Sequence, residues 1–387
     1  MVCLACGTDG TVEEAPRIVS LEASIDGRLW VVDEASRSYL LDTGTPRTLL
    51  SPEVLGLSAD TFEERAVSVA DWRDPAGLNN GTTPLVVVHP SAFLEADGVI
   101  GMDLLAGHSL SWLAPSSLAI APVGFLPEYG RPRAELPLAL AGGGRTCFGP
   151  GRCIDFGPTR AVLKIQVEGV EVDALLDTGA RHLVITGDLY EQLSRDDRPS
   201  LQIDVAGGER TRLSRVDEVT LGPLGLEQVV TQVLDVTPSV ERLRIETGRR
   251  IQAFVGTRPL RQFWPTIDPN AGRLSLAVGD ETTHGVGNST GLGFDVRLEP
   301  GCVRVVLLAR GLSPERNGLR LNDCITRVQT SSADPEEIER TIQNAVVAPI
   351  GSVFRTWVAR EGGEIQIDAE VESFLPPIPE SEARVHF

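Results

Sequence analysis

The chain has 387 residues, of which 42% are hydrophobic, and a formal net charge of −19. This length allows two or three domains, whereas the acidic balance argues against nucleic-acid binding, because a nucleic-acid-binding surface must neutralise phosphates. No apolar run approaches the roughly 18 residues that span a bilayer, so we expect no transmembrane segment.

Residues 1–16 are expected to form an N-terminal tether. The run CLACG, followed by polar and acidic residues, is similar to the end of a bacterial lipoprotein signal with Cys6 as the lipidated residue, but no apolar segment precedes it. Either the start is truncated or the similarity is a coincidence. We expect an extracytoplasmic location, periplasmic or on the outer surface and lipid-anchored if the signal is real, with a cytoplasmic location as the alternative.

Short alternating apolar and polar stretches bounded by Gly, Pro, Asn and Asp predict β-rich structure over 17–130 and again over 159–279. A Pro- and Gly-rich connector, 131–158, separates the two segments. Its CFGPGRC stretch carries Cys147 and Cys153, whose pairing in a small disulfide is left open because it depends on geometry.

The two β-rich segments contain the same motif. YLLDTGTPRTLL places Asp42 after an apolar run, and ALLDTGARHLVI does the same with Asp177. The second run follows two predicted strands that are joined by a tight turn at Glu168-Gly169. In each segment an apolar-apolar-Gly sequence follows, ending at Gly101 and Gly256. This pattern predicts a duplicated unit.

Two such units would bring two carboxylates together. Two carboxyl groups about 3 Å apart cannot both ionise, so they share one proton. The ionised member can then take a proton from water while the neutral member protonates a carbonyl oxygen. The flanking residues would support this pair, because the glycines permit a sharp turn and the threonine hydroxyls can form hydrogen bonds between the two loops. The candidate loop residues are Thr43, Gly44, Thr45, Thr178, Gly179 and Ala180.

These residues resemble those of retropepsin-type aspartic proteases, as two units fused in one chain in the manner of bilobal pepsin-like enzymes. The resemblance covers residues 17–279 and implies Asp42 and Asp177 as a catalytic dyad, hydrolysis of peptide bonds without metal or cofactor, and inhibition by statine-type transition-state mimics. The hydroxyl of Thr45 would stabilise an ionised Asp42, which leaves Asp177 as the proton holder of the pair.

The resemblance also implies a hairpin that covers the substrate, and two places are candidates. In the first segment the stretch ADWRDPAGLNNGTTP carries Trp72, in the absence of the usual flap tyrosine. In the second segment VAGGERTRL carries Gly207 and Gly208 and is more similar to the Gly-rich retropepsin hairpin. The sequence does not decide between them.

Residues 289–372 resemble a PDZ domain of the bacterial kind, β-rich with two helices. The motif GLGF comprises Gly291, Leu292, Gly293 and Phe294, whose backbone N–H groups would bind the C-terminal carboxylate of a peptide. Asp334 as N-cap and Pro335 at the first helical position predict a helix. The neighbouring GNSTG matches a serine-hydrolase motif, but it directly precedes GLGF and we interpret it as linker.

The last segment, 373–387, is predicted to be an extended tail ending in Val-His-Phe, which could occupy the PDZ groove itself or be a free terminus.

The sequence therefore predicts a mainly β protein: a bilobal acid-protease-like fold followed by a PDZ domain. The predicted activity is that of an aspartic endopeptidase acting on peptide or protein substrates as a monomer. The alternatives are a catalytically inactive protease-like scaffold whose PDZ domain binds partner proteins, and a homodimer in which each Asp-Thr-Gly unit pairs with its twin.

Overall fold

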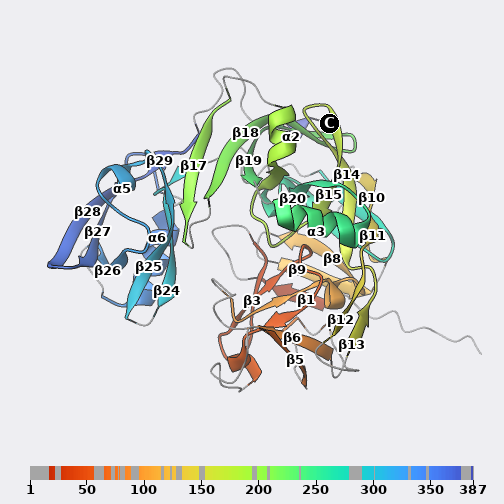
Figure 1. The fold of residues 1–387 in the computed structure, drawn as a ribbon. Helices are drawn as coiled ribbons and strands as arrows, with labels where there is room; N and C mark the ends of the chain where they lie inside the picture. The colour runs from red at the N-terminus through yellow and green to blue at the C-terminus, as the bar shows by residue number, and fades with distance from the viewer. Residues whose placement is uncertain are drawn as a thin grey trace, which may run out of the picture.

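The computed structural model has a mainly β fold (Figure 1). Within the part of the chain that it describes, no helix is long and apolar enough to cross a bilayer. The residues described are 17–21, 28–55, 65–70, 75–76, 78, 83–88, 96–114, 117–122, 124–127, 133–147, 153–193, 198–206, 210–234, 237–278, 290–299, 301–329, 333–345, 348–375 and 385–386.

The first β-rich segment forms a sheet in the order β2-β3-β7-β4-β6-β5. Strand β3 runs parallel to β7, and β4 lies between β7 and β6, antiparallel to the first and parallel to the second. The elements are β2 (Trp30–Val32), β3 (Ser38–Leu41), β4 (Leu49–Leu50), the 3-10 helix η1 (Pro52–Leu55), β5 (Arg65–Ala70), β6 (Thr83–Val88), β7 (Gly98–Ile100) and the short helix α1 (Met102–Leu105).

The second segment repeats these pairings, with β15 parallel to β20 and β16 lying between β20 and β19. The predicted tight turn is confirmed, because Glu168 and Gly169 both have positive φ, 48° and 80°. The elements are β14 (Arg160–Val167), β15 (Val170–Leu176), β16 (Leu183–Thr186), α2 (Gly187–Gln192), β17 (Ser200–Val205), β18 (Arg210–Leu221), β19 (Leu224–Leu234), α3 (Thr237–Thr247), β20 (Ile251–Val255) and α4 (Thr257–Leu260).

A further sheet joins the two segments in the order β1-β9-β8-β21-β22-β10. At its centre β8 pairs with β21, and one buried apolar cluster extends from Val19 to Leu276 through both segments. The strands are β1 (Arg17–Ser20), β8 (His108–Ala114), β9 (Ser117–Pro122), β10 (Arg133–Pro137), β21 (Trp264–Asp268) and β22 (Arg273–Ala277). The segments are therefore held together by backbone hydrogen bonds as well as by side-chain packing.

The connector is more ordered than its Pro and Gly content suggested. It contributes β10 to the shared sheet and also forms β11 (Ala139–Ala141), β12 (Gly144–Cys147) and β13 (Cys153–Phe156). Ala134, Leu136 and Leu138 are buried while the residues between them are exposed, which is the alternation of a half-buried strand. In the β12–β13 pair, Cys147 lies directly opposite Cys153.

The C-terminal module has its own core, built from residues between Leu292 and Val371. The two predicted helices are present, and the second begins at Pro335 as expected. The elements are β23 (Thr290–Gly291), β24 (Phe294–Glu299), β25 (Cys302–Ala309), α5 (Ser313–Arg316), β26 (Cys324–Val328), α6 (Pro335–Asn344), β27 (Val353–Arg360), β28 (Gly363–Glu370) and β29 (Glu372–Ser373). The module is the blue part of Figure 1.

The sequence left two positions open for the tail, the groove of the C-terminal module or a free terminus, and its described residues are instead paired with the second segment. Its final strand β30 (Val385–His386) pairs antiparallel with β19 of the second segment, with His386 opposite Gly225. Residues 385–386 therefore add a short strand to the sheet of the second segment.

Candidate active site

Two equivalent loops follow the buried strands β3 and β15. The last residues of these strands, Leu41 and Leu176, have no exposed surface. Each following aspartate is tied to the parallel neighbour strand by its backbone: Asp42 N donates to Ile100 O at 3.0 Å, and Asp177 N donates to Val255 O at 3.0 Å. In both segments, therefore, a backbone hydrogen bond to the neighbouring strand holds the aspartate at the end of its buried strand.

The two loops are hydrogen-bonded to each other through their buried threonines. Thr43 N donates to Thr178 Oγ1 and Thr178 N donates to Thr43 Oγ1, both at 3.0 Å. Each hydroxyl also donates across to the opposite strand end, from Thr43 Oγ1 to Leu176 O at 2.9 Å and from Thr178 Oγ1 to Leu41 O at 2.7 Å. These four bonds fix the two Asp-Thr-Gly loops relative to each other within one chain.

The carboxylates meet where only glycine fits. A Cβ atom added to Gly44 would lie 2.7 Å from Oδ2 of Asp177, and one added to Gly179 would lie 2.5 Å from Cγ of Asp42. Such distances are far below van der Waals contact, so each glycine is required by the approach of the opposite carboxyl group. The structure thus brings Asp42 and Asp177 together.

The surroundings of the two carboxylates differ. Asp42 accepts hydrogen bonds from Gly44 N at 2.7 Å, from Thr45 N at 3.2 Å and from Thr45 Oγ1 at 2.5 Å. Asp177 accepts from Ala180 N at 3.0 Å, and Ala180 has no hydroxyl to add. Burial raises the pKa of Asp177 well above its usual value, and the adjacent Asp42 carboxylate raises it further. The assignment of the shared proton to Asp177 stays a prediction.

Sequence reasoning missed an arginine that supports the first loop. Arg160, at the start of β14, donates through NH1 to Gly44 O and through NH2 to Glu246 Oε2 at 3.0 Å. Glu246 lies on α3, a helix that the sequence analysis did not predict. These residues lie far from Gly44 and from each other in the sequence, so no local pattern could have identified them.

Of the hairpin candidates, Trp72, Gly207 and Gly208 all lie outside the described residues. The strands on either side of 207–209 are described: β17 and β18 pair antiparallel, with Ser200 opposite Ser214 and Asp204 opposite Arg210. The first candidate place is likewise flanked by an antiparallel pair, β5 and β6, with Ala70 opposite Thr83, so the choice between the two places stays open.

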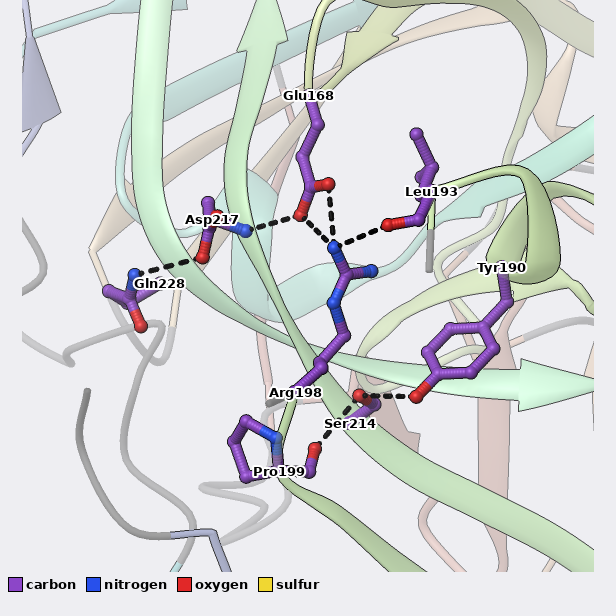
Figure 2. Close-up of polar contacts among 8 residues, drawn as sticks. All are labelled: Glu168, Tyr190, Leu193, Arg198, Pro199, Ser214, Asp217 and Gln228. Carbon is purple, nitrogen blue, oxygen red and sulfur yellow. Dashed lines mark hydrogen bonds and ion pairs between the residues drawn. The ribbon is translucent and has the colours of Figure 1, made fainter. Parts of the chain in front are cut away.

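A buried polar network holds the base of the β17–β18 hairpin (Figure 2). Arg198, only 4% exposed, donates through NH2 to both carboxylate oxygens of Glu168, at 2.8 and 2.6 Å, and to Leu193 O at 2.9 Å. Ser214 Oγ donates to Pro199 O at 2.9 Å and lies 3.2 Å from the hydroxyl of Tyr190. The start of β17 is thereby fixed to the body of the second segment.

The GLGF residues of the C-terminal module form the end of β23 and the beginning of β24, and all four are buried. Gly293 has a φ of 76°, a conformation that favours glycine, and its oxygen accepts a hydrogen bond from Ala309 N at 2.7 Å. Strand β24 pairs with β25, and among the described strands its other edge has no partner. The preceding GNSTG motif begins outside the described residues.

Within the described residues there is no group of three or more His, Cys, Asp or Glu side chains that could hold a metal ion. The site chemistry that the described residues offer is that of two adjacent carboxyl groups in different environments.

Comparison with known proteins supports an aspartic-protease-like segment. Residues 163–257, which contain the second Asp-Thr-Gly loop, match the family model described as aspartyl protease. Among solved structures, the chain is similar to a retropepsin-like aspartic protease from Rickettsia conorii, with 15% identity and a TM-score of 0.25, over 40% of this chain and 96% of that one. No curated protein matches the chain.

Proposed function

We propose that this chain is an aspartic endopeptidase in which Asp42 and Asp177 together activate a water molecule. Asp42, ionised and held by Thr45, takes a proton from the water as it attacks the scissile carbonyl carbon. Asp177, which holds a proton, gives it to the carbonyl oxygen. Asp42 then passes the proton that it took from the water to the amide nitrogen, and Asp177 takes a proton back from a hydroxyl of the tetrahedral intermediate, so the C–N bond breaks and both carboxyl groups return to their starting states. The reaction needs no covalent intermediate.

The observation that carries this proposal is the asymmetric environment of two carboxylates that approach each other. A pair with identical surroundings would have no built-in preference for the position of its proton. Here the Thr45 hydroxyl donates to Asp42, Ala180 offers no such donor to Asp177, and burial together with the adjacent Asp42 carboxylate raises the pKa of Asp177. The aspartyl-protease match over 163–257 supports the same chemistry independently of the geometry.

For the C-terminal module we infer a role in binding peptide C-termini. The support is the Gly291–Phe294 loop with its positive φ at Gly293, together with the edge of β24 that pairs with no described strand and lies beside helix α6. A peptide could add to this edge as a further strand and place its carboxylate at the loop. Such binding would recruit substrates or regulate the protease segment.

The test is cleavage of a mixed peptide library by the full chain between pH 3 and 7, with Asp42→Asn and Asp177→Asn alongside. Both variants should lose turnover while remaining folded, because neither carboxyl can perform both proton transfers alone. Asp188→Asn is the matched control, since that aspartate is exposed and its ion-pair partner is Arg250 rather than either of the two loops. Activity that survives in both variants would refute the dyad, and inactivity of the folded wild type would favour the scaffold alternative.

A further inference from the structure

The C-terminal module is attached to the β17–β18 hairpin by strand pairing. Strand β17 pairs antiparallel with β25 of the module, with Ile203 opposite Ala309 and Val205 opposite Leu307. Two further backbone bonds extend the pairing, from Ala206 N to Val306 O at 2.8 Å and from Arg310 N to Gln202 O at 3.0 Å. Figure 1 shows β17 between β18 and the module. The hairpin and the module therefore share one continuous sheet.

Side chains reinforce this junction. Arg310 Nε lies 2.7 Å from Asp204 Oδ2 across the two strands. Beneath them a small apolar cluster combines Ile203 and Leu213 of the hairpin with Ala309 and Leu312 of the module, all at most 9% exposed. Since a buried cluster of this kind is packed like a protein core, neither element can shift without displacing the other.

The same residues contact the proposed carboxylate-binding loop. Ala309, which pairs with Ile203, donates its N–H to Gly293 O at 2.7 Å. The side chain of Leu312 packs against Gly293 so closely that a Cβ added there would lie 2.6 Å from its Cδ1. Ala309 and Leu312 thus lie between the loop and the hairpin and touch both.

The other end of the hairpin cannot follow the module as a rigid body. Arg198 and Glu168 hold the start of β17 in the second segment, as Figure 2 shows. A displacement of the module at residues 307–310 must therefore bend β17 beyond Ser200 and β18 beyond Arg212, the last residue of β18 that pairs with β19. The fixed base and the attached outer strand make the hairpin the element through which the module can act on the protease segment.

We propose that the Gly291–Phe294 loop and the β17–β18 hairpin are energetically coupled, so that a peptide carboxylate bound at the loop and a substrate bound over the two aspartates each strengthen binding of the other. This inference rests on the proposed function. The loop contacts the packed cluster through Ala309 and Leu312, and the hairpin contributes Ile203 and Leu213 to it, so a ligand that orders one of these elements leaves less conformational entropy to be lost when a second ligand orders the other. Because such coupling is reciprocal, it can be measured from either site.

The experiment is amide hydrogen exchange of the full chain with and without a statine-type inhibitor. Inhibitor binding should slow exchange in the Asp42 and Asp177 loops. It should also slow exchange at residues 291–294 and at Ala309 by at least about fivefold, because fivefold is the lower end of typical coupling strengths. Ile203→Ala, which opens a cavity at the junction, and Asp204→Asn, which removes the ion pair with Arg310, should each reduce the slowing at 291–294. Arg327→Gln, which breaks an exposed pair within the module, is the control and should retain it.

The outcomes separate the two proposals. Slowing in both aspartate loops without any change at 291–294 and Ala309 would refute the coupling and leave the proposed function standing. Absence of slowing in the aspartate loops themselves would count against the proposed function, and the coupling would fail with it. Slowing at 291–294 that persists unchanged in both junction variants would also refute the coupling through the hairpin, because it would show that the effect reaches the loop by another route.

Discussion

Replacing Thr43 by valine tests whether the crossed threonines hold the two halves of the site together. Valine keeps the shape of the side chain but removes a hydroxyl that donates to Leu176 O and accepts from Thr178 N. Leu176 and Thr178 have no exposed surface, so water cannot replace the lost partner. A buried polar group that loses its partner costs about 1–3 kcal/mol. Two such groups predict a loss of about 2–6 kcal/mol in the free energy of unfolding.

The measurement is urea unfolding followed by tryptophan fluorescence, with Thr178→Val as the symmetric partner variant. Thr231→Val is the matched control, because Thr231 is equally buried but its hydroxyl donates to Leu183 O within one segment, at 3.1 Å. We expect Thr43→Val and Thr178→Val to be similar to each other and each about twice as damaging as the control. Losses no larger than that of Thr231→Val would refute the argument that these bonds join the halves.

Three other changes have defined outcomes. In urea unfolding, Asp177→Asn should become more stable relative to the wild type as the pH rises. The pKa of Asp177 is raised in the folded state, so the folded wild type loses stability as the pH rises above the ordinary aspartate range. The variant has no carboxyl group at this position and does not lose this stability. Arg198→Gln should cost about 3–5 kcal/mol, since it leaves the buried Glu168 carboxylate unpaired, whereas Arg250→Gln, in an exposed pair, should leave the urea midpoint unchanged. Gly44→Ala should abolish peptide cleavage while the chain still folds, because its methyl group displaces the Asp177 carboxyl.

Much of the site could be predicted from local sequence because its parts are local. The Leu-Leu-Asp-Thr-Gly motif combines a buried strand, a carboxylate and a tight turn in five residues, and its second occurrence indicated the pairing of Asp42 with Asp177. The reciprocal hydroxyl contacts of Thr43 and Thr178 follow from the same symmetry. The difference between Thr45 and Ala180 was also visible in the sequence, and in the structure the Thr45 hydroxyl donates to Asp42.

The features that escaped prediction depend on tertiary contacts. Arg160 donates to Gly44 O and also to Glu246, which lies on α3, and nothing in the sequence around any of these residues indicates the two contacts. Strand β10 was hidden in the connector because Pro and Gly on both sides dominated its short apolar alternation. The pairing of β17 with β25 joins edges whose sequences indicate a strand but not its neighbour. Strand pairing is non-local, so composition and periodicity do not reveal it.

The order β1-β9-β8-β21-β22-β10 has a consequence for dividing the chain. Strand β10 follows the first segment in sequence but pairs with β22 of the second, and β1 pairs with β9 of its own segment. A cut before β10 would therefore leave each fragment with all of its own strands in this sheet, and the only pairing lost from it would be that between β8 and β21. Each fragment alone would present one of these as an unprotected edge. We therefore expect the two fragments, produced separately and mixed, to associate through β8 and β21 and to place Asp42 of one piece beside Asp177 of the other.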